Sequence, residues 1–427
     1  MKRFSDMVAM PFGAKYLLDE LEPSSPSTRS YVMEREMMTS HKQIEAYRRR
    51  YDCIVSSDAV RIAARLSGLK NITHTLDRLA VGEVLDEVEL FEVKRLAMIS
   101  RDVSAMIVGT AVSLPSSERT IRLLDPDHTG VGSFYIYDSY DGRLAELRRR
   151  AVDPEGVAAV LTVEQQVRER LSTALQPKAK GLKTALQSLF EIDFMLAVGR
   201  QNLREGFTMP KLGNRTLLHQ LVNPKVRADL DGRFQSVDIG LSARPTVLVG
   251  ANMGGKSVTL RSVALAQTAL QFGFGVAVSD DSEMQLFDEI CFVADTTERG
   301  YSSFAAEMRA VDRVVRAVSG GEAVLALVDE PARTTNPVEG RALVEALIDV
   351  CRSERSQLFV ATHYNLTHID CNRLRVRGLV GGTMNYEIAA AQEGERPNEA
   401  LAVAEQLGVD IIWIENAKNR IENESKE

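Results

Sequence analysis

The chain has 427 residues, of which 44% are hydrophobic and 26% are charged, a composition typical of a folded protein with more than one domain. Its formal net charge of −7 argues against a protein dedicated to nucleic-acid binding, although a local basic patch would be compatible with it. The 4 cysteines lack metal-ligand spacing, the N-terminus has no secretion signal, and no stretch approaches the ~20 apolar residues of a membrane helix. We therefore expect a cytoplasmic protein with no membrane partner.

The first half of the chain is predicted to be mainly helical. Residues 1–30 form a lead-in segment that ends in a loop, and residues 31–206 form a helical core and lever region. The basic cluster at 47–51 is either a phosphate-contacting patch or, as is commoner for such clusters, a solvated helix face. Leucines and valines spaced by four predict packed helices around 163–175 and 182–196, whereas residues 133–138 are predicted to form a short strand or extended segment.

From residue 207 to residue 427, short apolar runs alternate with helical patterns. This alternation predicts an α/β domain with a mainly parallel sheet. The expected strands lie at 247–249, 275–278, 323–328 and 358–361.

A strand, a glycine loop and a helix follow one another at residues 246–272. Residues 250–257 read Gly-Ala-Asn-Met-Gly-Gly-Lys-Ser and match the phosphate-loop pattern, in which backbone N–H groups and a helix N-terminus bind phosphates. We expect Lys256 to reach the β- and γ-phosphates and the Ser257 hydroxyl to bind Mg²⁺. The other loop residues expected to contact the nucleotide are Gly250, Asn252, Gly254, Gly255 and Val258.

Two later strands are expected to deliver polar residues to the same place. The apolar run at 323–328 leads to Asp329, which would hold Mg²⁺ directly or through water, and to Glu330, which would orient the attacking water. His363 follows the strand at 358–361 and either contacts the γ-phosphate or positions the water. Alone, this histidine is more simply interpreted as a hydrogen-bonded loop residue, but the other two motifs favour a functional role. Residues 300–308 predict a helix N-terminus, which is either capped by its own serines or free to bind phosphate.

Four motifs in order resemble those of MutS-type ATPases. Residues 250–257 are similar to the distinctive phosphate loop of that family, and residues 302–308, Ser-Ser-Phe-Ala-Ala-Glu-Met, resemble its signature segment. Residues 328–335 resemble its acidic strand and the loop that follows, and Ala-Thr-His-Tyr at 361–364 matches a further element. The resemblance implies an α/β P-loop ATPase domain of the ABC type at 207–427, preceded by the helical region.

In that family two chains sandwich each nucleotide. The resemblance therefore implies a homodimer, or a heterodimer with a related subunit, that binds ATP and Mg²⁺ and hydrolyses ATP. Ser302 of one chain would contact the γ-phosphate bound to the other, and Phe234 would stack on the adenine, although a core position for Phe234 is equally compatible with its sequence context.

Several departures from the family pattern bear on the partner of this ATPase. We find no Phe-x-Glu mismatch-reading element in a comparable place, little room between 143 and 204 for a full DNA-gripping clamp, and no Smr nuclease domain, as in a short form of the family. Glu330 is followed by Pro331 and Ala332, where the family usually has Ile-Gly.

Two functions fit these features. The first is a DNA-associated, mismatch-repair-like ATPase whose ATP cycle drives a lever motion, with residues 47–51 as a candidate DNA contact. The alternative is a protein-remodelling ATPase that reactivates a metabolic enzyme, a cobalamin-dependent aminomutase, as short MutS-like proteins are associated with doing.

Overall fold

The computed structural model describes residues 2–231, 234–250, 255–294, 302–380, 383–393, 401, 404–405 and 408–424. The chain divides into two compact units. The sheet unit comprises Met1–Glu20, Glu36–Ile44 and Asn202–Glu427, and the helical unit comprises Leu21–Arg35 and Glu45–Gln201. Among the described residues, none of the helices is both long enough and apolar enough to cross a membrane.

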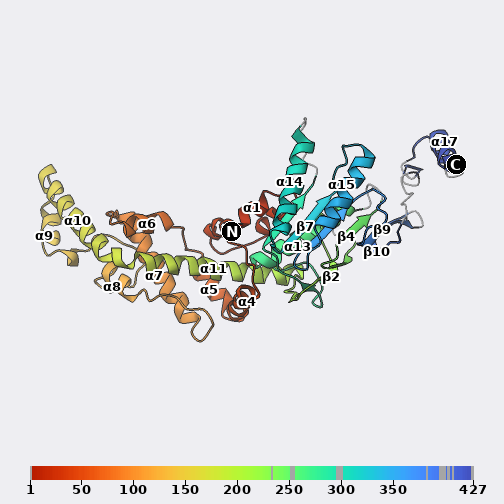
Figure 1. Ribbon diagram of the computed structural model, residues 1–427. Helices are drawn as coiled ribbons and strands as arrows, with labels where there is room; N and C mark the ends of the chain where they lie inside the picture. The colour runs from red at the N-terminus through yellow and green to blue at the C-terminus, as the bar shows by residue number, and fades with distance from the viewer. Residues whose placement is uncertain are drawn as a thin grey trace. The chain divides into compact units, whose positions relative to one another are not determined.

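The helical unit is built from packed amphipathic helices (Figure 1). The predicted apolar stripes are confirmed: Val163, Val167, Leu171 and Leu175 are buried along α10, and the leucines at 182, 186, 189 and 196 are buried along α11. Asp153 caps the first turn of α10, which begins with Pro154. The elements of this unit, with α4 and α11 shared at their ends with the other unit, are α3 (Ser27–Met33), α4 (His41–Val55), α5 (Ala59–Leu66), α6 (Thr73–Ala80), α7 (Glu87–Met106), α8 (Glu118–Leu124), η1 (Asp138–Tyr140), α9 (Leu144–Arg150), α10 (Pro154–Leu175), η2 (Gln176–Lys178) and α11 (Ala179–Glu205).

Residues 133–138 were predicted to form a short strand or an extended segment. The strand is wrong, because the segment has no regular structure up to η1 and pairs with none of the described strands. Ile136 and Tyr137 of this segment are nevertheless buried. Tyr137 is 1% exposed, and its hydroxyl lies 3.0 Å from the Nζ atom of Lys94, which is fully buried and paired with Asp125 at 3.2 Å. The segment is therefore held by side chains around a buried ion pair rather than by a β-ladder.

The basic cluster at 47–51 lies on α4, and its aromatic members do not face solvent. Tyr47 and Tyr51 are buried, and their rings stack at 6.2 Å between centroids. Arg49 is exposed, while Arg50 lies 3.8 Å from the buried Glu191 carboxylate. The tyrosines are thus part of the core of the helical unit, and they offer no exposed platform on which nucleic-acid bases could stack.

The sheet unit contains a six-stranded sheet in the order β10-β9-β4-β8-β7-β6. The neighbours β9 and β4, β4 and β8, β8 and β7, and β7 and β6 run parallel, and only the β9–β10 pair is antiparallel. This confirms the predicted α/β fold with a mainly parallel sheet. The strands are β4 (Thr246–Val249), β6 (Glu289–Val293), β7 (Val324–Asp329), β8 (Gln357–Ala361), β9 (Asn372–Val380) and β10 (Thr383–Ala390).

A second, four-stranded sheet has the order β1-β5-β2-β3. The strand expected at 275–278 is not a strand of either sheet, because Val276 forms only an isolated bridge with Thr208. Val276 and Val278 of this segment are buried nonetheless, which explains why the sequence resembles a buried strand. The strands of this sheet are β1 (Lys211–Leu212), β2 (Thr216–Leu221), β3 (Val237–Leu241) and β5 (Glu283–Met284).

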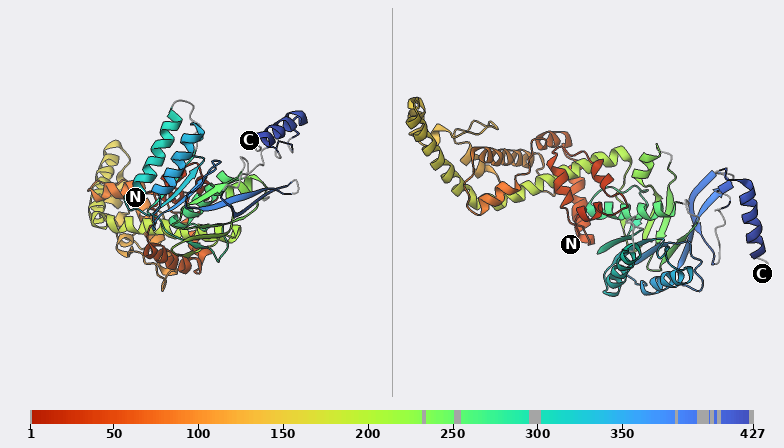
Figure 2. Two further views of the ribbon diagram at one scale, coloured as in Figure 1. Left: turned by 45° about the vertical axis from the view of Figure 1, so that its right-hand side comes forward. Right: turned by 90° about the horizontal axis from the view of Figure 1, so that it is seen from above.

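Helices cover the larger sheet, and α14 and α15 lie side by side in this unit (Figure 2). The central helix α13 is almost wholly buried. The first residues of the chain pack against its end, since the Phe4 ring lies 5.3 Å from the rings of Phe272 and Phe274. The helices of the sheet unit are α1 (Phe4–Val8), α2 (Lys15–Asp19), α12 (Pro224–Asp229), α13 (Lys256–Phe272), α14 (Ser302–Ser319), α15 (Pro337–Val350) and α17 (Ile411–Glu424).

Candidate nucleotide-binding site

The glycine loop joins the centre of the larger sheet to α13. Strand β4 ends at Val249, Gly250 follows it, and Gly255 caps the start of α13 with φ +80°, a conformation that favours glycine. A Cβ atom at Gly255 would also lie 3.0 Å from the Tyr386 ring. Backbone freedom and close approach therefore both require glycine here. Asn252 and Gly254, predicted to contact the nucleotide, lie outside the described residues.

Lys256 is held at the mouth of this loop. Its side chain is 4% exposed, and its Nζ atom donates a 2.8 Å hydrogen bond to the carbonyl oxygen of Gly250. The same Nζ atom lies 3.3 Å from Oε1 of Glu330. The Lys256 amine thus already faces two oxygen acceptors, a carbonyl and a carboxylate. Phosphate oxygens can take the place of these acceptors. The structure thus brings two of the predicted residues into direct contact.

Ser257 and Asp329 form the second contact of the site. Asp329 is the last residue of β7, and the Ser257 hydroxyl is hydrogen-bonded to its carboxylate. Burial raises the pKa of the Asp329 carboxyl, an effect that the Ser257 hydrogen bond partly offsets and the charge of Glu330 reinforces. Within the described part of the chain, the buried Oδ1 atom of Asp329 has no hydrogen-bond partner. A hydroxyl beside a carboxylate oxygen with spare acceptor capacity fits the hard oxygen ligands of Mg²⁺.

Glu330 follows Asp329 in an unusual backbone conformation. Its φ is +47°, and its N–H donates a 2.9 Å hydrogen bond to the carbonyl oxygen of Ala361 at the end of β8. The carboxylate faces Lys256 on one side and lies 3.7 Å from the guanidinium of Arg333 on the other. The turn thus directs the Glu330 side chain at Lys256, although Glu330 follows β7 and the phosphate loop follows β4.

His363 lies at the same edge of the sheet, because β8 is placed between β4 and β7. The Thr362 N–H donates a 3.1 Å hydrogen bond to the Leu248 carbonyl, which ties this strand end to the strand before the phosphate loop. The imidazole is exposed and lies 4.4 Å, between ring centroids, from the buried Tyr364. Ser302 begins α14, and its side chain is outside the description, so its predicted contact with nucleotide stays a prediction.

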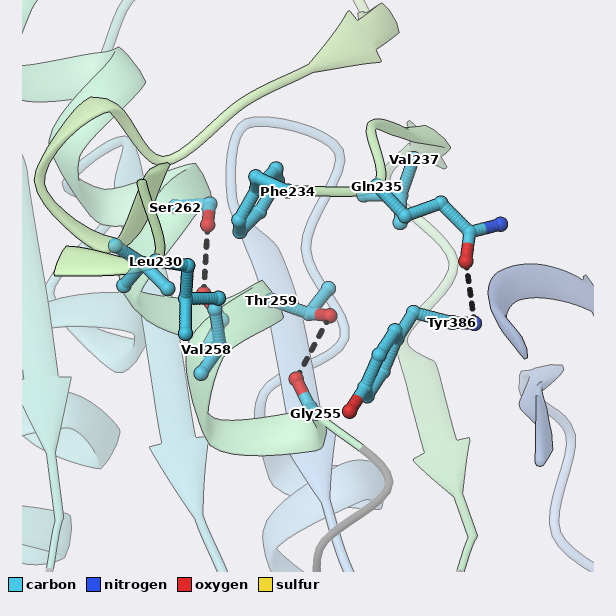
Figure 3. Close-up of a pocket in the computed structure, with 10 residues that line it drawn as sticks. Leu230, Phe234, Gln235, Val237, Gly255, Val258, Thr259, Ser262 and Tyr386 are labelled. Atoms are coloured by element: carbon cyan, nitrogen blue, oxygen red, sulfur yellow. Dashed lines mark hydrogen bonds between the residues drawn. The ribbon is translucent and has the colours of Figure 1, made fainter. Parts of the chain in front are cut away.

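A pocket opens beside the first turn of α13, with the rings of Phe234 and Tyr386 on different sides of it (Figure 3). Val258, which was predicted from the sequence to contact the nucleotide, also lines this pocket. The Tyr386 N–H donates to Oε1 of Gln235 at 2.9 Å, so β10 is tied to the segment that carries Phe234. The remaining lining residues are Val226, Leu230, Gln235, Val237, Gly255, Thr259 and Ser262.

Tyr386 is the aromatic residue of this pocket that the sequence analysis did not identify. It lies on the antiparallel edge strand β10, far along the chain from the phosphate loop. No local pattern around it differs from that of an ordinary strand, so only the three-dimensional arrangement indicates its place beside Gly255.

Comparisons with known proteins agree with this geometry. Residues 246–407 match MutS domain V. The chain is 25% identical over 265 residues to an endonuclease MutS2 of Lactobacillus johnsonii, covering 58% of this chain and 32% of the relative. It is 30% identical over 234 residues to the DNA mismatch repair protein MutS of Thermus thermophilus, covering 54% of this chain and 27% of the relative. The chain thus spans about a third of the length of the curated relatives it matches. Both the motifs and these similarities identify residues 246–407 as a domain of the MutS type.

Proposed function

We propose that this chain binds ATP together with Mg²⁺ and hydrolyses the terminal phosphate. The observation that carries the proposal is the convergence of four side chains from the start of α13 and the end of β7. Lys256 and Ser257 open α13, Asp329 ends β7, and Glu330 turns back from that strand to reach Lys256 at 3.3 Å. Among P-loop enzymes this set of groups performs phosphoryl transfer to water.

Each group has a distinct role in the proposed reaction. Lys256 leaves Gly250 and Glu330 to bind the β- and γ-phosphates. Ser257 and Asp329 would hold Mg²⁺, which would neutralise charge on the phosphates. Glu330 then accepts a hydrogen bond from the attacking water and orients it towards the γ-phosphorus. His363, at the neighbouring strand end, contacts the γ-phosphate or this water.

We further propose that the pocket beside α13 binds the adenine. Phe234 and Tyr386 supply aromatic faces, and Val258 supplies an apolar contact next to the residues that bind phosphate. Val258 directly follows Ser257, so the same turn of α13 would contact both the base and the phosphates.

The complete site is proposed to need a second chain. In a homodimer, or a heterodimer with a related subunit, Ser302 at the start of α14 would contact the γ-phosphate held by the opposing phosphate loop. Binding of ATP would then close the dimer, and hydrolysis would release it. This closure is the two-state element that would drive a lever motion of the helical unit.

The partner on which this motion acts is proposed to be DNA, because relatives carry the names DNA mismatch repair protein and endonuclease. A second candidate is a protein partner, as in the reactivation of a cobalamin-dependent aminomutase. Two observations favour it: the formal net charge is −7, and Tyr47 and Tyr51 of the basic cluster are buried. A protein partner requires neither a positive surface nor exposed aromatic rings.

Hydrolysis is tested by measuring phosphate release from ATP by the purified chain with and without Mg²⁺. We expect Mg²⁺-dependent turnover that Lys256→Ala abolishes, whereas Lys183→Ala, in the helical unit, leaves it unchanged. Absence of turnover in the wild-type chain over a range of protein concentrations that allows dimers to form would refute the proposal.

A salt series of duplex DNA binding distinguishes the two partners. Phosphate contacts give a log–log slope of about −0.9 per contact, so DNA association predicts binding at ~50 mM salt that weakens steeply as salt is added. No binding at that salt concentration, with or without ATP, would reject DNA and leave the protein partner. Co-purification with a metabolic enzyme would then support the remodelling function.

A further inference from the structure

The loop after Glu330 contains two residues in a conformation that side chains disfavour. Glu330 has φ +47° and Ala332 has φ +59°, on either side of Pro331. For residues other than glycine, this left-handed region is unfavourable because the Cβ atom comes too close to the following carbonyl oxygen. Ala332 is also completely buried. Such a loop persists only where neighbouring groups hold it.

Two side chains hold the backbone of Ala332 from opposite ends of the residue. The Ala332 N–H donates a 2.6 Å hydrogen bond to Oε1 of Glu307, on α14. The Tyr364 hydroxyl donates a 2.8 Å hydrogen bond to the Ala332 carbonyl oxygen. The Ala332 carbonyl also accepts a 3.3 Å hydrogen bond from the Thr335 N–H within the turn. The N–H and the carbonyl of this buried residue are thus each held by a side chain from another part of the fold.

Tyr364 has little freedom to move away from this loop. It is 7% exposed, and a Cβ atom at Gly340 would lie 2.2 Å from its hydroxyl oxygen. Its own N–H donates to the Thr362 hydroxyl at 3.1 Å. Glycine at position 340 thus leaves space for the phenol that fixes Ala332.

The Glu307 carboxylate adds charge to this arrangement. Burial raises the pKa of the Tyr364 phenol, and the nearby charge of Glu307 raises it further, so the phenol keeps the proton that it donates. A hydrogen bond from a backbone N–H to an ionised carboxylate is roughly twice as strong as a neutral one. Glu307 is therefore the stronger of the two contacts on Ala332.

We propose that Glu307 is a positioning residue for ATP hydrolysis: by holding the Ala332 N–H it fixes the strained turn that directs the Glu330 carboxylate at Lys256. The inference rests on the hydrolytic function proposed above. The proposed role connects α14, which begins at Ser302, with the turn that carries Glu330. Because Glu307 and Ser302 lie on the same helix, a displacement of α14 is transmitted through the Ala332 N–H to the turn that carries Glu330.

Three variants of the full chain test this role by steady-state ATP hydrolysis. Glu307→Ala removes the acceptor, and we expect kcat to fall about ten-fold or more while KM changes less than about three-fold, since the groups that bind nucleotide are untouched. Glu307→Gln keeps an oxygen acceptor of the same shape, and we expect it to retain kcat within about three-fold. Asp312→Ala removes an exposed carboxylate elsewhere on α14 and should match the wild type.

A fourth variant tests the role if Glu307→Ala does not fold. Tyr364→Phe removes only the hydroxyl that holds the Ala332 carbonyl, and it should also lower kcat with little change in KM. Suppose that the wild type hydrolyses ATP but kcat is unchanged in folded Glu307→Ala or in Tyr364→Phe. This result would overturn the positioning role of Glu307 and leave the proposed hydrolytic function standing. Equal losses in kcat and thermal stability in Glu307→Ala and Glu307→Gln would overturn it too, because they would indicate general destabilisation. No hydrolysis by the wild type would overturn both this inference and the function on which it rests.

Discussion

Replacing Glu330 by glutamine tests two properties of the site at once. In the structure Glu330 pairs with Lys256, the residue proposed to bind the β- and γ-phosphates. ATP must therefore separate the pair before Lys256 can contact it, and the negative carboxylate repels the incoming phosphates. Glu330→Gln removes the charge but keeps the shape of the side chain. We expect this variant to bind ATP more tightly and to hydrolyse it much more slowly.

The size of the binding effect follows from the geometry of the pair. At the observed 3.3 Å, two unit charges attract by about 5 kcal/mol when the effective dielectric constant is about 20. Much of this attraction is offset by the cost of desolvation, since the Lys256 and Glu330 side chains are only 4% and 15% exposed. A net gain of about 1.4 kcal/mol for the variant corresponds to about ten-fold tighter binding.

Calorimetric titration with a non-hydrolysable ATP analogue measures this affinity, and phosphate release measures turnover. Glu354→Gln, an exposed glutamate away from the site, is the matched control and should leave both unchanged. If Glu330→Gln hydrolyses ATP at the wild-type rate, its proposed role in activating water is wrong. If its affinity equals that of the wild type, the ion pair with Lys256 does not oppose nucleotide binding.

Three further changes probe neighbouring features. Burial raises the folded-state pKa of Asp329 above 3.8, so its ionised form destabilises the nucleotide-free fold. Asp329→Asn should therefore raise Tm at pH 7, and this gain in Tm should shrink as the pH falls toward 3.8. Thermal unfolding scans at several pH values measure both effects. Ala332→Gly relieves a left-handed alanine and should stabilise the chain by up to about 1 kcal/mol, measured by denaturant unfolding; a loss of stability would contradict the strain argument. Ser302→Ala should slow hydrolysis while nucleotide affinity stays within about three-fold, and an unchanged rate in this variant would argue against its role across a dimer.

The centre of the sheet unit could be predicted from sequence because its signals are local. Strand, glycine loop and helix at 246–272 are contiguous, and β4 and α13 occur where they were expected. The acidic strand was predicted for the same reason, since a buried parallel strand is a continuous apolar run and its end is marked by Asp329 and Glu330. Parallel pairing then brings these strand ends together, so the meeting of Lys256 with Glu330 follows from topology.

Residues placed by long-range packing could not be found in this way. Tyr386 reaches the pocket from the edge strand β10, and nothing near it in sequence refers to Gly255. The irregular segment at 133–138 has strand-like composition, but its Tyr137 is buried against Lys94 rather than in a sheet. Burial produces the same apolar pattern in both cases, so composition alone cannot distinguish a strand from a segment held by side chains.

The backbone conformation gives a physical meaning to the departure from the MutS-type pattern at Pro331 and Ala332. Glycine occupies the left-handed region at little cost, so a relative with Ile-Gly here would need less external support for the turn after its catalytic carboxylate. Alanine at φ +59° makes this turn depend more on the contacts that hold Ala332. Glu307 and Tyr364 supply those contacts, and they belong to the signature helix and to the strand end beside His363. Ala332, where this chain departs from the MutS-type pattern, is therefore the residue whose backbone Glu307 and Tyr364 hold.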